Sequence, residues 1–71
     1  MAEKGKRYKV KFDSYKRFNK GDIVVAIESD DVAYCVLEEN YVEGKEVDDY
    51  SVYDYAPLCD KELEKIESED K

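Results

Sequence analysis

The sequence predicts a small, mainly β domain, a barrel of four to five antiparallel strands followed by a short C-terminal helix. Three observations support this prediction. The chain has 71 residues, enough for one domain and one core, so we expect residues 1–71 to form a single domain. Short segments alternate apolar and polar residues with the period of two that is typical of strands. Turn-forming Gly, Asn and Asp residues separate these segments.

The first half of the chain contains the clearest strands. Lys6 to Phe12 alternates, with Tyr8, Val10 and Phe12 predicted inward and Arg7, Lys9 and Lys11 outward. A long loop follows to Gly21, with Tyr15 and Phe18 as expected anchors in the core. Asp22 to Glu28 has apolar residues on both faces, which predicts a central strand. Val32 to Glu38 alternates after the turn formers of 28–31, which predicts a hairpin.

The second half has weaker patterns. Lys45 to Tyr53 is predicted as a strand with a bulge or turn at Asp48-Asp49. Pro57 is predicted to end the sheet and start a helix to Glu67. Its apolar stripe would be Cys59, Leu63 and Ile66. We expect disorder in 1–5 and 68–71.

One segment carries a family resemblance. Residues 18–24, Phe-Asn-Lys-Gly-Asp-Ile-Val, resemble the turn that leads into the second strand of many SH3-like barrels. The similarity is to short SH3-like barrel proteins of bacteria and their phages, and it implies an SH3-like barrel encoded by a phage or mobile element. Members of that group bind proteins or nucleic acid, so the resemblance implies no single function. Val52-Tyr53-Asp54-Tyr55 is also similar to the ALYDY motif of eukaryotic SH3 domains, but that motif precedes the Gly-Asp turn there and follows it here, which indicates coincidence.

Charge is divided between the two ends of the chain. Residues 1–20 carry eight basic and two acidic side chains, a net charge of +6, whereas residues 21–71 carry four basic and 17 acidic ones, a net charge of −13. Such a division indicates how a protein meets its partners and says little about its fold. The acidic part is the larger surface.

We therefore predict a non-enzymatic interaction module that binds a basic protein partner through an acidic face bearing tyrosines. The predicted contact residues are Glu38, Glu39, Tyr41, Asp48, Asp49, Tyr50 and Tyr53. Tyrosine suits an interface because it joins a rigid apolar face to a polar tip. Two simpler interpretations stay open: the carboxylates only keep the protein soluble, and the tyrosines only cover the edges of a small barrel.

The alternative prediction is nucleic-acid binding by the basic strand and loop from Lys6 to Lys20. The candidate contacts with phosphates are Arg7, Lys9, Lys11, Lys16 and Arg17. The acidic remainder of the chain would repel a polyanion, and a simpler interpretation pairs these cations with acids on neighbouring strands.

Other classes of function find little support. The chain has no histidine, so it lacks a Ser-His or Cys-His nucleophile pair, and no phosphate-binding glycine motif occurs. We expect no enzymatic activity, no cofactor and no metal site. No segment has the roughly 18 apolar residues of a membrane span, so we expect a cytoplasmic protein, a monomer or weak homodimer without a membrane partner. Cys35 and Cys59 are then expected to stay reduced.

Overall fold

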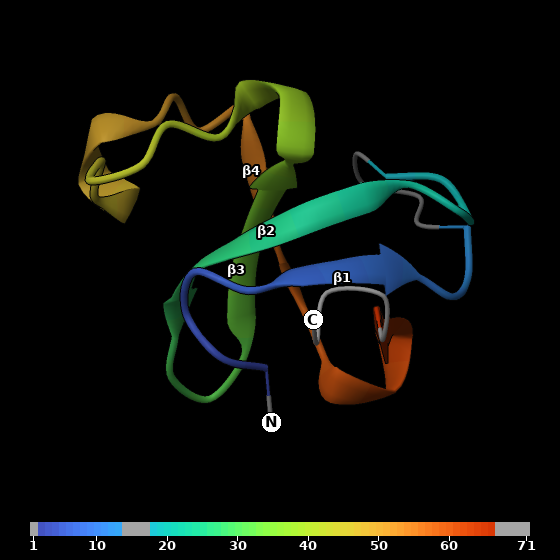
Figure 1. The fold of residues 1–71 in the computed structure, drawn as a ribbon. Coiled ribbons are helices and arrows are strands. Elements are labelled where there is room, and N and C mark those ends of the chain that lie inside the picture. The colour runs from blue at the N-terminus through green and yellow to red at the C-terminus, as the bar shows by residue number, and fades with distance from the viewer. Residues whose placement is uncertain (1, 14–17, 67–71) are drawn as a thin grey trace.

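We describe the protein from a computed structural model that defines residues 2–13 and 18–66 (Figure 1). Five strands and three single turns of 3-10 helix, labelled η, occur in this part of the chain. In order they are β1 (Arg7–Val10), β2 (Ile23–Ser29), β3 (Ala33–Leu37), η1 (Glu38–Asn40), η2 (Val47–Asp49), β4 (Tyr55–Leu58), η3 (Asp60–Glu62) and β5 (Leu63–Lys65). The mainly β prediction is confirmed.

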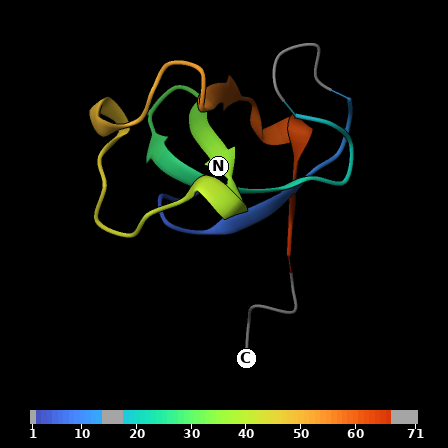
Figure 2. The same cartoon turned by 90° about the horizontal axis from the view of Figure 1, so that it is seen from above.

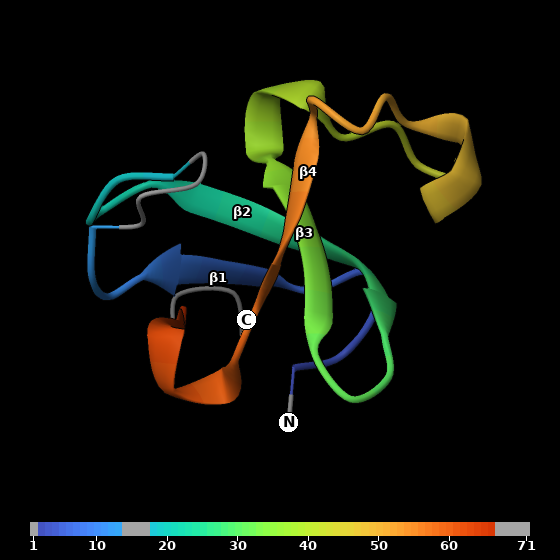
Figure 3. The same ribbon diagram turned by 180° about the vertical axis from the view of Figure 1, so that it is seen from behind.

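The five strands form one antiparallel sheet in the order β4-β3-β2-β1-β5. β2 is the central strand, as its two apolar faces predicted. Ala26 pairs with Cys35 and Glu28 with Tyr34, so Ile27 is the extra residue of a β-bulge. A bulge bends a sheet, and in Figures 1 and 3 β3 and β4 cross the direction of β1 and β2.

The larger core covers one face of the sheet. β1 contributes Tyr8 and Val10 to it, as the alternation predicted, and Phe18 reaches it from the β1–β2 loop with 1% of its surface exposed. The members of this first core are Ala2, Tyr8, Val10, Phe18, Val24, Ala26, Ala33, Cys35, Ala56, Leu58 and Leu63, with Leu37 packed against them. Phe12 was predicted to point inward and is 57% exposed, because β1 ends at Val10.

A smaller core covers the opposite face. Ile27 and Val36 on the sheet pack against Tyr50, which comes from the segment between β3 and β4. Tyr34, Tyr41, Val47 and Tyr55 are packed around these three residues. The ring centroids of Tyr34 and Tyr55 are 6.0 Å apart in an edge-to-face arrangement, a geometry that aromatic pairs favour. β2 is therefore covered on both faces.

The N-terminal segment is held against the sheet. The N–H of Ala2 donates to Asp60 Oδ1 at 3.0 Å, and Ser29 Oγ donates to the carbonyl of Ala2 at 2.7 Å. The N–H of Gly5 donates to the carbonyl of Ala26 at 2.7 Å. Residues 2–5, for which the sequence predicted disorder, thus have defined partners, whereas 68–71 lie outside the described residues.

Two predictions for the second half of the chain are wrong. Residues 45–53 form turns and η2 in place of a strand, because Tyr50 packs into the smaller core, against Ile27 and Val36. Residues 58–66 form no α-helix: Leu63 pairs with Val10 of β1, and this long-range pairing replaces the local helical pattern. Pro57 lies inside β4, an edge strand, where a residue without an N–H is tolerated.

Within residues 2–13 and 18–66, no helix is long and apolar enough to cross a membrane.

Candidate functional site

The acidic connection, defined here as residues 38–54, joins β3 to β4 and has a net charge close to that of the whole chain. It has seven carboxylates and one lysine, a net charge of −6 in a chain whose net charge is −7. All seven carboxylates are on exposed residues: Glu38, Glu39, Glu43, Glu46, Asp48, Asp49 and Asp54. Figures 1 and 2 show the connection on the opposite side of the molecule from η3 and β5.

Short turns give the acidic connection its shape. η1 ends where the N–H of Tyr41 donates to the carbonyl of Glu38. Gly44 has a φ of 89°, a left-handed conformation that favours glycine, at the turn that the Lys45 N–H closes on the carbonyl of Val42. η2 is capped by Asp49, whose Oδ2 accepts the N–H of Glu46 at 3.2 Å. The backbone of the connection is therefore defined by local hydrogen bonds.

Tyr50 holds the acidic connection onto the sheet. Its side chain is buried, with 6% of the residue exposed. Its hydroxyl accepts the N–H of Val42 at 2.9 Å and donates to the carbonyl of Val42 at 3.2 Å. The Lys45 ammonium lies 4.6 Å from the centroid of the Tyr50 ring, within the range of a cation–π contact. Tyr50, predicted as a contact residue, is thus an anchor of the connection.

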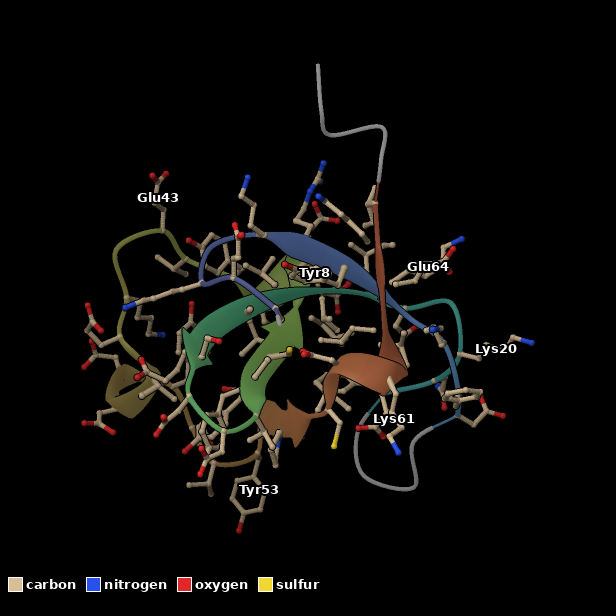
Figure 4. The ribbon with its side chains drawn as sticks, turned by 90° about the horizontal axis from the view of Figure 1, so that it is seen from below. Tyr8, Lys20, Glu43, Tyr53, Lys61 and Glu64 are labelled. Atoms are coloured by element: carbon tan, nitrogen blue, oxygen red, sulfur yellow. The ribbon has the colours of Figure 1, made fainter. Side chains whose placement is uncertain are left out.

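The same connection carries most of the large hydrophobic side chains that are exposed in the described part of the chain. Among the described residues, four large hydrophobic side chains are exposed, and three of them belong to the connection: Val42 (53%), Val52 (62%) and Tyr53 (78%). Apolar side chains scattered singly on a surface are ordinary, but here they lie among carboxylates. In Figure 4, Tyr53 and Glu43 point outward at two separate places on the connection. The exposed side chains of the connection therefore point in more than one direction (Figure 4).

Two of the predicted residues meet in a pocket. Glu38 and Tyr41, together with Gly5, Arg7 and Val25, line a pocket of about 330 Å³. The Arg7 Nη1 donates to Glu38 Oε2 at its wall, and both side chains are partly exposed. Asp48, Asp49 and Tyr53 are not part of the pocket. No pattern in the sequence pointed to Gly5 or Val25 as pocket residues. The pairing of β2 with β3 places Val25 near Glu38, and the pairing of β1 with β2 places Arg7 opposite Val25.

The basic strand lies against carboxylates. Arg7 pairs with Glu38, and Lys9 lies opposite Glu64 in the β1–β5 ladder. Just before β1, Lys4 Nζ is 3.3 Å from Glu46 Oε1. The simpler interpretation placed the acids on neighbouring strands, and of these three contacts only that of Lys9 with Glu64 lies between strands. Lys11 is exposed, while Lys16, Arg17 and Tyr15 lie outside the described residues.

The two cysteines differ in their exposure to solvent. Both thiols are free, Cys35 buried and Cys59 exposed. Burial, with a contribution from the Glu62 carboxylate, raises the pKa of the Cys35 thiol to about 12. No group of three or more Cys, Asp or Glu side chains is arranged to hold a metal ion within the described part of the chain.

Comparisons with protein families, curated proteins and solved structures found no match to this chain.

Proposed function

We propose that the protein is a small, non-enzymatic interaction module whose acidic connection binds a basic protein partner. One observation carries the proposal: a connection folded back on the sheet by Tyr50 presents seven exposed carboxylates and three exposed apolar side chains. Carboxylates attract a basic surface and speed its approach, and exposed aromatic and aliphatic groups gain free energy when a partner covers them.

The contact residues follow from burial and hydrogen bonding. Glu38, Glu39, Tyr41, Asp48 and Tyr53 are the contacts that we propose, all of them at least partly exposed. Asp49 is also exposed, but its carboxylate caps η2, so it acts in part through the shape of the connection. Tyr50 positions the others from the second core.

The fold that we propose for this module is an SH3-like barrel. Five antiparallel strands support it, as do the adjacency of the first and last strands and the turn at Gly21, whose φ of 95° leads into β2. The short SH3-like barrel proteins to which residues 18–24 are similar include protein-binding members, which agrees with the proposed activity.

Charge reversal tests the proposal. Glu39 and Asp48 are exposed, and no hydrogen bond or ion pair joins their side chains to another described residue. Glu39→Lys with Asp48→Lys therefore changes the field of the connection without breaking its turns. The wild-type chain is used to capture a partner from source lysate, and its dissociation constant is measured with purified components at several salt concentrations. We expect the double variant to bind at least about tenfold more weakly and with a smaller dependence on salt.

The control is a second double reversal, Asp30→Lys with Asp31→Lys. These exposed acids lie in the β2–β3 turn, at the other end of β3 from the acidic connection, and the net charge changes by the same amount. We expect close to wild-type affinity. Equal weakening of both variants would mean that only net charge matters, and unchanged affinity in the first would remove the acidic connection as the site. Tight binding of labelled single-stranded or duplex nucleic acid at about 50 mM salt would favour the alternative function instead.

A further inference from the structure

The pocket beside η1 has the size and lining for one long, positively charged side chain. Its volume of about 330 Å³ is at the lower end of the range for ligand sites, too small for a large cofactor. Val25, 2% exposed, supplies an apolar surface from the central strand. Tyr41 adds an aromatic ring and Glu38 a carboxylate. An aliphatic stem with a cationic end matches these three groups.

Arg7 shows that the Glu38 carboxylate can bind a guanidinium group. Its guanidinium reaches Glu38 from β1 and forms an ion pair there. The two side chains are 45% and 42% exposed, and ion pairs exposed to this extent contribute little to stability because water and salt screen them. A second guanidinium can therefore take the place of Arg7 at a small cost.

The electrostatic surroundings favour a cation over an anion. The pocket lies where the acidic connection begins, and Glu39 follows Glu38 directly along the chain. An anion attracted by Arg7 would meet the repulsion of a segment with a net charge of −6. A cation of the partner gains from the same field.

We propose that this pocket receives an arginine side chain of the basic partner, which replaces Arg7 on the Glu38 carboxylate and lies against Tyr41 and Val25. The proposal rests on the proposed function and adds the residue type that the partner inserts. Arginine suits the pocket better than lysine because its planar guanidinium forms two parallel hydrogen bonds with a carboxylate and packs on aromatic rings. Arg7, once released, remains as a cation near the edge of the interface.

An acetylated hexa-arginine peptide tests the pocket on the full chain, with hexa-lysine as the comparison. Glu38→Gln and Glu39→Gln remove the same charge from neighbouring residues, and only Glu38 lines the pocket. We expect Glu38→Gln to weaken hexa-arginine binding about fivefold and Glu39→Gln less than about twofold, measured by isothermal titration calorimetry at low salt. The wild type should prefer hexa-arginine over hexa-lysine.

Two variants of β1 test the replacement of Arg7. Arg7→Met frees Glu38 of its partner, whereas Lys9→Met makes the same change of charge on the same face of β1 and outside the pocket. We expect Arg7→Met to tighten hexa-arginine binding about fivefold and Lys9→Met to change it less than about twofold. Unchanged or weaker hexa-arginine binding by Arg7→Met would overturn the proposal, because Arg7 would then not compete with the peptide for Glu38.

The two proposals fail in different ways. If Glu38→Gln and Glu39→Gln weaken hexa-arginine binding equally, the acidic connection still binds a basic partner and the pocket has no special role. If neither substitution changes the affinity, and Glu39→Lys with Asp48→Lys does not change it either, both proposals fall.

Discussion

The sheet with its first core and the acidic connection are stabilised in different ways. The first core packs side chains such as Phe18, Val24 and Leu58, each at most 1% exposed, and no buried charged group occurs among the described residues. The connection has one buried residue, Tyr50, and depends on its ring, on its hydroxyl and on capped turns. Its carboxylates all remain in contact with water.

This difference separates stability from recognition. Burial of apolar surface is the main source of folding free energy, so removing side chains from the first core weakens the whole domain. The charges of the connection contribute little to stability because exposed ion pairs are screened, yet they set the field that a partner meets. Substitutions in the two regions should therefore have separable effects.

The reactivity of the two thiols should show the largest contrast. Cys35 lies in the first core and its thiol pKa is raised to about 12, so at pH 8 only about one molecule in ten thousand carries the reactive thiolate. Cys59 is exposed. A thiol reagent at pH 8 should label Cys59 of the native chain quickly. It should label Cys35 only as the domain unfolds, about a thousandfold or more slowly. Mass spectrometry identifies the site, and rapid labelling of Cys35 would mean that the first core opens easily.

Phe18→Ala should cause the largest loss of stability. The ring is almost fully buried against the sheet, and its removal leaves a cavity that costs about 3–5 kcal/mol, most of the stability of a domain of this size. Phe12→Ala is the matched control, because this ring is 57% exposed and its removal should cost within about 0.5 kcal/mol. Urea denaturation measures both values, and similar losses would mean that Phe18 is not a principal part of the core.

Tyr50→Phe should loosen the acidic connection and leave the sheet intact. The substitution keeps the ring but removes both hydrogen bonds to Val42, at a cost of about 1–2 kcal/mol. Amide hydrogen exchange should accelerate in residues 41–50. Without denaturant, the thiol reagent should label Cys35 no faster in Tyr50→Phe than in the wild type, because the sheet stays folded. Tyr41→Phe is the control, because Tyr41 packs against the same core and its hydroxyl has no hydrogen bond to residues 2–13 or 18–66. Faster exchange throughout β1 to β3 would show that the two regions unfold together.

The sequence predicted the sheet better than the acidic connection for a physical reason. The strands β1, β2 and β3 have regular alternation, and the positions of Tyr8, Val10, Val25 and Ile27 follow from the period of two that covers a sheet face. Phe18 was identified as an anchor because it is a large apolar residue in a polar loop. These features depend on local pattern.

The errors occur where long-range contacts decide the structure. Leu63 has the spacing of a helical stripe, but it is paired with Val10 across the sheet. Tyr50 was predicted on a binding surface because its sequence neighbours are acids. In the structure its ring is buried against Ile27 of β2 and Val36 of β3. The acidic character of the site was predicted from composition, whereas the pocket beside Arg7 depends on the pairing of β1 with β2, which composition does not encode.

Asp60→Asn should have the smallest effect, and only over a defined range of pH. The N–H of Ala2 donates to the Asp60 carboxylate and lowers the pKa of this carboxyl below its ordinary value of 3.8. A lowered pKa stabilises the folded state above pH 3.8, and this stabilisation is lost as the pH falls through the pKa of the folded state. The wild type should therefore be slightly more stable than Asp60→Asn near pH 7, and the two urea midpoints should converge as the pH falls through the pKa of the folded state.

The control for this prediction is Asp31→Asn, which makes the same change of charge in the exposed β2–β3 turn and shows how much of any difference comes from net charge alone. A difference between wild type and Asp60→Asn that persists at low pH would mean that the substitution disturbs η3 itself and not the charge. If the two midpoints already agree at pH 7, the contact of Asp60 with Ala2 contributes nothing measurable to stability. The stability of the sheet would then depend on apolar burial even where a carboxylate holds the N-terminal segment.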